Sequence, residues 1–276
     1  MSIVITIGTV KGCVFASNRA GIVLPFPDGL PCGIAIGAGC DETVDKWLPF
    51  IKDFLKSPLL LPQDRFDAYV SAFLGYVEDR KPMLPELNAE VVLQGYGEKE
   101  MFPSGAHLPL GKGVDAAPPL ELAVQSFHPY GTSSLVQVLG EDDDVETLIH
   151  GVSEENVEDY TDAFARKARQ MKKRLVSAAE ESGNPEVIKA AKQIHVADYV
   201  SSFKESLGDM VKDHFLSPFD IAIESFNMDD LIGTAERLVD LAGTLKHFRD
   251  GEEGYASTKD IAIVTRAEGL VWIKRA

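Results

Sequence analysis

The sequence has few cysteines and no long apolar run, and both shortages exclude classes of protein. No stretch of its 276 residues approaches the roughly 18 apolar residues that a membrane-spanning helix needs. Its three cysteines, Cys13, Cys32 and Cys40, lack the Cys-x-x-Cys or Cys/His spacing of a zinc site. We therefore expect reduced, buried thiols, no membrane span, no metal and a cytoplasmic location.

Positive charge is also scarce. The chain holds 27 lysines and arginines against 43 aspartates and glutamates, a formal net charge of −16. Nucleic acids and anionic membranes attract basic surfaces, so this balance disfavours both as partners. The six histidines are dispersed without an HExxH-like pair, and no segment has the pattern of a phosphate-binding loop. We expect no cofactor.

The first forty residues have the pattern of strands. Ile3–Val10 is rich in β-branched residues, turns at Lys11-Gly12 and returns as Cys13–Arg19, which predicts a hairpin. A third strand is expected over 32–36, after a Pro/Gly-rich connection. The opening run has no basic residues before it and is broken by Thr and Gly, so it predicts a first strand rather than a signal peptide.

Beyond Cys40 the apolar period lengthens to that of helices and later returns to that of strands. Apolar residues at i, i+3, i+4 and i+7 predict helices over 41–56, 63–79, 154–182, 186–214, 219–226 and 228–248. Strands are predicted over 89–97, 120–127 and 135–139, with a closing hairpin of 260–265 and 270–273. The Gly/Pro-rich stretch 103–119 is expected to be a connection.

This order predicts an α+β protein in which two antiparallel sheets pack face to face between outer helix layers. Periodicity alone leaves other α+β arrangements open. We expect one domain over 1–276, with a helical elaboration around 154–214.

The long helix 154–182 is acidic in its first half and basic in its middle. Six basic and no acidic residues lie between Asp162 and Glu180. A solvated helix surface with i,i+4 ion pairs is the favoured interpretation of this block. A binding site for an acidic partner is the alternative.

Several segments carry a family resemblance. Val14-Phe15-Ala16-Ser17-Asn18-Arg19 is similar to the return strand of proteasome β-subunits and their bacterial relatives, and Gly33–Asp41 to the strand, Gly turn and helix start that follow. Gln94-Gly95-Tyr96-Gly97 resembles the central "L-x-G-Y-G" strand, and Lys259–Thr265 with Gly269–Ile273 the close of the family. The chain thus resembles the N-terminal-nucleophile (Ntn) hydrolases, which implies a four-layer αββα sandwich.

The resemblance also implies a chemistry. After removal of Met1, the Ser2 hydroxyl would attack an amide carbonyl, with its own α-amine as base and a backbone N–H of Gly37 stabilising the oxyanion. The aspartate of the family falls on Ser17 or Asn18, depending on one gap. Its lysine has no counterpart between Arg19 and Gly37.

Uninterrupted spacing places Val23 where that lysine is expected, and Lys11, in the hairpin turn, is the only lysine before Lys46. The leading hypothesis is therefore a proteasome-like protein whose catalytic set is degenerate. It would work by binding or self-assembly as a homo-oligomer, with a ring as one form. The alternative is an active amidohydrolase or peptidase that uses Ser2, and a third hypothesis is a monomeric α+β protein with a coincidental likeness.

Overall fold

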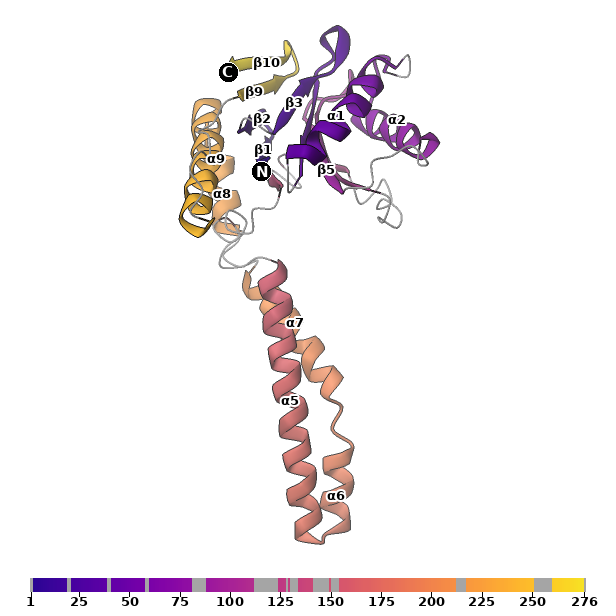
Figure 1. Cartoon of the computed structure of the whole chain (residues 1–276), viewed down its shortest axis with the longest axis vertical. Helices are drawn as coiled ribbons and strands as arrows, with labels where there is room; N and C mark the ends of the chain where they lie inside the picture. Colours follow the sequence, from indigo (N-terminus) through magenta and orange to yellow (C-terminus); the bar gives the residue numbers. More distant parts are fainter. Residues whose placement is uncertain are drawn as a thin grey trace. The chain divides into compact units, whose positions relative to one another are not determined.

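The computed structural model of the chain has two compact units (Figure 1). The first comprises Met1–Val145 and Asp220–Ala276, and the second Glu146–Phe219. The second unit contains the region of the predicted helical elaboration, and the single domain over 1–276 stays a prediction. The structure describes residues 2–18, 21–38, 41–57, 60–80, 88–111, 124–127, 129, 134–140, 149, 154–211, 217–250 and 260–275.

The first unit contains two antiparallel sheets of five strands each. One sheet has the order β10-β9-β2-β1-β8, with β1 at Val4–Thr9, β2 at Gly12–Ser17, β8 at Ser134–Leu139, β9 at Asp260–Thr265 and β10 at Gly269–Lys274. The other has the order β3-β4-β5-β6-β7, with β3 at Ile22–Pro25, β4 at Cys32–Gly37, β5 at Ala89–Gly95, β6 at Ser104–Leu110 and β7 at Val124–Ser126. The predicted α+β class with two antiparallel sheets is confirmed.

A buried apolar cluster joins the two sheets. Val4 and Phe15 contribute to it from the first sheet, and Val23, Ala35 and Val92 from the second. Successive residues of a strand point to opposite faces, so each of these strands presents every second side chain to this cluster. The inner faces of the sheets therefore pack on each other.

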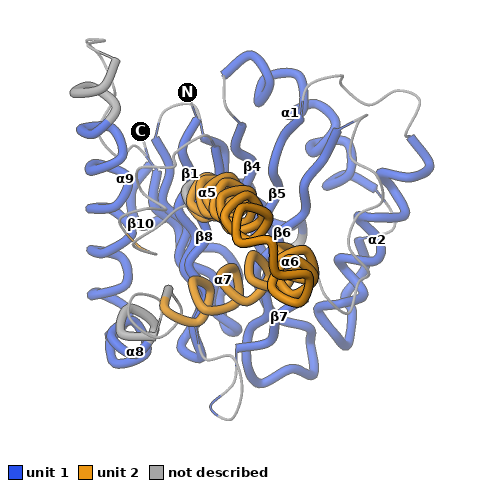
Figure 2. Tube along the Cα trace, turned by 90° about the horizontal axis from the view of Figure 1, so that it is seen from below, with its two compact units in different colours: residues 1–145, 220–276 blue, residues 146–219 orange. Residues whose placement is uncertain are grey.

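Helices cover outer faces of the sheets. α1 (Asp41–Leu55) and α2 (Phe66–Asp79) pack their apolar stripes on the second sheet, where Trp47, Phe54 and Phe73 are fully buried. α9 (Met228–Asp250) contacts β1 and β2 of the first sheet. Figure 2 shows α9 on one side of the strands of this unit and α1 and α2 on the other.

Two strands differ from the sequence-based expectation. Residues 103–119 were expected to connect strands, but Ser104–Leu110 forms β6, paired with β5 over its whole length. The segment Ile22–Pro25, inside the expected Pro/Gly-rich connection, forms β3. Glycine and proline lower the strand propensity of both segments, and pairing with a buried neighbour outweighs that local preference.

The second unit contains a helical hairpin, α5 (Glu154–Ser182) followed by α6 (Pro185–Lys192) and α7 (Val196–Val211). The break after α5 follows the sequence: Gly183 has a φ of +66°, and the Asn184 side chain caps α6 by accepting from the N–H of Glu186. The single helix predicted over 186–214 is wrong, because the chain breaks between Lys192 and Val196. Among the described residues, no helix is long and apolar enough to span a membrane.

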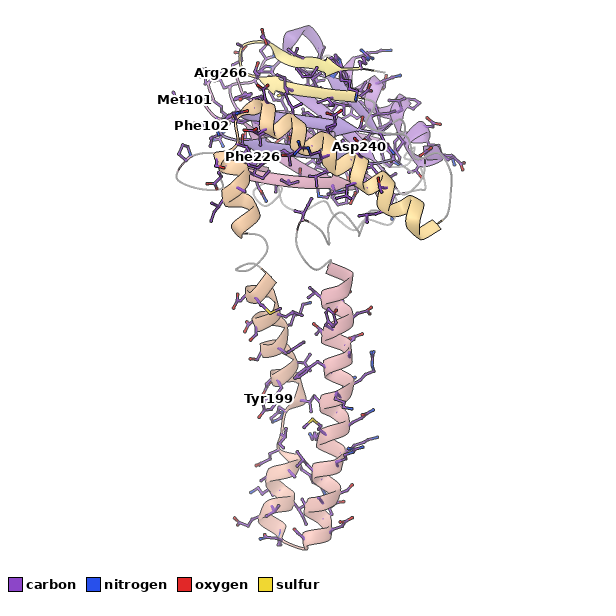
Figure 3. The ribbon with its side chains drawn as sticks, turned by 90° about the vertical axis from the view of Figure 1, so that its left-hand side faces the viewer. Met101, Phe102, Tyr199, Phe226, Asp240 and Arg266 are labelled. Carbon is purple, nitrogen blue, oxygen red and sulfur yellow. The ribbon has the colours of Figure 1, made fainter. Side chains whose placement is uncertain are left out.

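The rest of the described chain contains a short 3₁₀ turn, η1 (Pro27–Gly29), and the helix α8 (Ser217–Ser225). Figure 3 draws the described side chains on the ribbon.

Candidate functional site

The three predicted site residues lie at one end of the sheets of the first unit. Ser2 precedes β1, and Asn18 follows β2, whose last residue Ser17 pairs with Val4. Gly37 ends β4 of the opposite sheet. Folding thus brings together residues up to 36 positions apart in the sequence, through the Ser2–Ala38 hydrogen bonds.

The Ser2 hydroxyl is engaged in both directions. It donates to the carbonyl oxygen of Ala38 at 2.7 Å and accepts from the N–H of Ala38 at 2.7 Å. The side chain is fully buried. The backbone N–H that reaches this hydroxyl therefore belongs to the residue after Gly37. A Cβ at Gly37 itself would lie 2.6 Å from the Cβ of Leu139, so close packing alone accounts for glycine there.

The Asn18 side chain is hydrogen-bonded to backbone N–H groups. Its side-chain oxygen accepts from the N–H of Ile3 and from the N–H of Gly21, both at 3.0 Å. Its own N–H donates to the carbonyl of Ile3 at 3.1 Å. Asn18 thus fixes the entry into β1 beside the exit from β2, and its amide brings no ionisable group to Ser2.

Ser17 is the second residue that the family resemblance left open for the aspartate. It lies two positions after Phe15 in β2 and shares its inward face, and it is fully buried. Among the described residues, its hydroxyl has no hydrogen-bond partner. The inward position of β2 nearest this end of the sheet thus carries a neutral hydroxyl.

An apolar side chain occupies the position expected for lysine. Val23 lies in β3 opposite Ala35, is 4% exposed and packs with Val4 and Leu139 between the sheets. Lys11 lies at the other end of the β1–β2 hairpin. Its amine donates to the backbone carbonyls of Glu224 and Phe226.

The sequence reasoning missed a carboxylate at this end of the sheets. Glu90 of β5 pairs with Gly37, and its Oε2 accepts from the N–H of Gly140 at 3.1 Å. Its Oε1 lies 3.6 Å from Nε2 of His107, beyond hydrogen-bond distance. The alternation of β5 places Glu90 on the same inward face as Val92, a signal that could have found it.

Gly140 connects this carboxylate to Ser2. Its φ of +103° lies in the left-handed region, and a Cβ there would lie 2.0 Å from the carbonyl oxygen of Ser2. The backbone at 140 therefore lies against the backbone at Ser2. Glu90 holds that backbone in place and makes no described contact with the Ser2 hydroxyl.

The described cysteines are buried thiols. Burial raises the pKa of Cys13 and of Cys32 well above the usual range, so both thiols stay protonated at neutral pH. Cys40 lies outside the described residues. In the part of the chain that the structure describes, no group of three or more His, Cys, Asp or Glu side chains could hold a metal ion.

No family model matches the sequence, and no curated protein matches it. A solved structure described as a selenomethionine-labelled Anbu (Gly-1) mutant from Hyphomicrobium sp. strain MC1 is similar at a TM-score of 0.31 and 11% identity. The similarity covers 51% of this chain and 61% of that chain. A likeness of this size carries no argument about function, and the interpretation of the Ser2 end rests on its own geometry.

Proposed function

We propose that the chain is a proteasome-like protein of the Ntn-hydrolase fold, a four-layer αββα sandwich, whose catalytic set is degenerate. It works in the cytoplasm by binding and by self-association as a homo-oligomer, with a closed ring as one form. The packing of α1 and α2 on one sheet and of α9 on the other supports this fold. So does the position of Ser2 at the start of a strand between sheet neighbours.

The state of the Ser2 hydroxyl carries the proposal that catalysis is lost. The hydroxyl is fully buried and bonded in both directions to Ala38, so attack on a substrate carbonyl would first require both bonds to break. Val23 stands where the family resemblance expects lysine, and Ser17 or Asn18 where it expects aspartate. Electrostatic groups of this kind are worth about 10²–10³ in rate each.

One observation favours the alternative, an amidohydrolase or peptidase. The N–H of Ala38 lies 2.7 Å from the Ser2 hydroxyl, so a nucleophile and a backbone donor are adjacent. In this mechanism the free α-amine of Ser2 takes the hydroxyl proton as the oxygen attacks the carbonyl. The amine fragment leaves with that proton, and water then hydrolyses the ester.

A covalent probe distinguishes the two functions. The full chain is prepared in two forms, with Met1 retained and with Ser2 as the first residue, and intact mass identifies each. Both are treated with a fluorophosphonate and a β-lactone, and labelled residues are mapped by mass spectrometry. We expect no label on Ser2 in either form. Labelling of the Ser2-first form that is lost in Ser2→Ala would overturn the proposal.

Self-association is tested separately. Multi-angle light scattering of the full chain over a range of concentrations is expected to give a mass above the 30.1 kDa of one chain. A single mass of one chain at every concentration would contradict the proposed assembly.

A further inference from the structure

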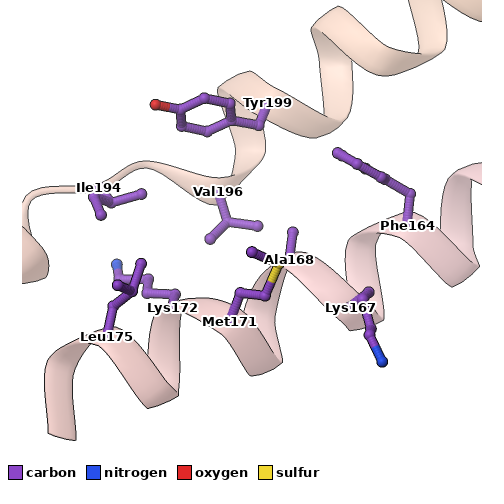
Figure 4. Close-up of a pocket in the computed structure, with 9 residues that line it drawn as sticks. All are labelled: Phe164, Lys167, Ala168, Met171, Lys172, Leu175, Ile194, Val196 and Tyr199. Atoms are coloured by element: carbon purple, nitrogen blue, oxygen red, sulfur yellow. The ribbon is translucent and has the colours of Figure 1, made fainter. Parts of the chain in front are cut away.

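The helical hairpin of the second unit carries an apolar groove. Its walls are formed by α5, by Ile194 and by the first turn of α7, and its volume is about 280 Å³. Figure 4 shows Phe164, Ala168 and Met171 on α5 facing Val196 and Tyr199. The groove follows one face of α5 from Phe164 to Leu175, at spacings of three and four residues.

The hairpin leaves much of its apolar surface open. Over 154–211 the described side chains that are buried belong to three alanines, Ala165, Ala179 and Ala191. Six of the ten exposed large apolar side chains found among the described residues lie in the same segment: Tyr160, Met171, Leu175, Val187, Tyr199 and Met210. Tyr199, labelled in Figure 3, and Met171 are about 60% exposed, at 61% and 59%. A gathering of apolar side chains of this kind marks an interaction surface.

The groove is bordered by positive charge. Lys167 and Lys172 line it, and four more cations lie on α5 close by, Arg166, Arg169, Lys173 and Arg174. Among the described residues, none of these six takes part in an ion pair. The i,i+4 pairs expected for a solvated helix surface are therefore not formed by this block, although the chain carries a net charge of −16.

We propose that this groove binds an acidic amphipathic helix of a partner protein. From Phe164 to Leu175 the groove covers eleven helical steps, or about 16 Å, which matches three turns of a second helix. Apolar side chains of the partner at i, i+3, i+4 and i+7 would fill the groove, as amphipathic helices do in other apolar grooves. Acidic side chains flanking that stripe would meet Lys167 and Lys172.

Charge favours this partner over a groove-to-groove pair of two copies of the chain. Groove-to-groove pairing of two hairpins would bring Lys167 and Lys172 of one copy toward the same residues of the other, and like charges at an interface are unfavourable. An acidic helix in the groove would not be repelled by these lysines. The inference deepens the proposed binding function by naming a partner class, and it rests on that function for its biological meaning.

Two designed peptides of 18 residues test the groove. Both carry the same leucine stripe, one with glutamates on the flanks and the other with lysines. Binding to the full chain is followed by fluorescence anisotropy at two salt concentrations. We expect the acidic peptide to bind at least about tenfold more tightly than the basic one, with an advantage that shrinks as salt rises.

Variants of residues that line the groove sharpen this test. The double variant Lys167→Glu/Lys172→Glu is expected to reverse the preference for the acidic peptide, and Met171→Ser to weaken binding of both peptides about fivefold. Lys189→Glu/Lys204→Glu, on α6 and α7 and outside the groove lining, is the control with the same change of net charge and should change little. Circular dichroism of each variant checks that the helices are intact.

Three outcomes would overturn the inference. Equal binding of the two peptides would remove the charge argument, and unchanged affinity of Met171→Ser would place binding elsewhere. An oligomer that dissociates on Met171→Ser without peptide would assign the groove to a second copy. Failure of the proposed function is distinguishable, because reactivity of Ser2 with the covalent probes would leave peptide binding intact.

Discussion

The Ser2 end of the first unit and the groove of the second unit differ in which side chains they bury and which they expose. At the Ser2 end, the buried side chains of Ser2 and Asn18 are hydrogen-bonded to backbone, and the nearby Val23 is buried and apolar. In the groove, apolar side chains are exposed and cations have no ion-pair partners among the described residues. The residues singled out as a candidate site thus lie in one region, and the exposed apolar and basic side chains lie in the other.

Substitution by lysine in each region should give the largest difference in stability between the two regions. Val23→Lys places an ammonium among the apolar side chains of Val4 and Leu139 and is expected to cost about 3–5 kcal/mol of the free energy of unfolding. Leu175→Lys, at a position 50% exposed, should change it by less than about 0.5 kcal/mol.

Urea denaturation measures the free energy of unfolding of both variants. The two tryptophans of the chain, Trp47 and Trp272, lie in the first unit, so their fluorescence reports that unit, and circular dichroism reports the hairpin helices. A Val23→Lys variant as stable as the parent at pH 7 would mean that this end can solvate a charge. The apolar surroundings of residue 23 would then not by themselves exclude a charged group there.

A pair of glycines tests how closely the backbone is packed in each region. Gly140→Ala would place a Cβ 2.0 Å from the carbonyl oxygen of Ser2 at a φ of +103°, and we expect a loss of about 3 kcal/mol. Gly183→Ala has a similar left-handed backbone, φ +66°, but no atom within 4 Å. Its loss should be about 1 kcal/mol, the cost of backbone strain alone. Equal losses, measured by the same denaturation, would contradict the close contact at Ser2.

The sequence allows much of the fold to be predicted, for local reasons. Strong apolar periodicity marked α1, α2, α5 and α9, and β-branched runs marked the first and last hairpins. β3 and β6 could not be predicted this way, because their Gly and Pro residues favour turns and only pairing with β4 and β5 makes them strands.

The candidate site was predictable to a different degree. The resemblance named Ser2, Asn18 and Gly37, and they do lie at one end of the sheets, but their catalytic roles stay predictions. That the Ser2 hydroxyl bonds in both directions to Ala38 depends on a contact between two sheets, which no local pattern encodes. The contact of Glu90 with Gly140 is equally non-local. The open groove depends on which side chains a neighbouring helix leaves uncovered.

Two asparagines whose side-chain oxygens accept from backbone N–H groups should show the smallest difference in stability between the two regions. Asn18→Ala removes the acceptor of two buried N–H groups, those of Ile3 and Gly21, and is expected to cost about 2 kcal/mol. Asn184→Ala removes one cap from the N–H of Glu186, an exposed group that water can bond instead, and should cost about 1 kcal/mol or less.

Asn18→Asp separates shape from charge in the same measurement. It keeps an acceptor oxygen for both N–H groups, so we expect it to lose less stability than Asn18→Ala. If Asn18→Ala and Asn184→Ala cost the same, Asn18 does not organise the Ser2 end. If Asn18→Asp is as stable as the parent and Ser2 then reacts with the covalent probes, the missing carboxylate limits the reactivity of Ser2 more than the bonds of its hydroxyl to Ala38 do.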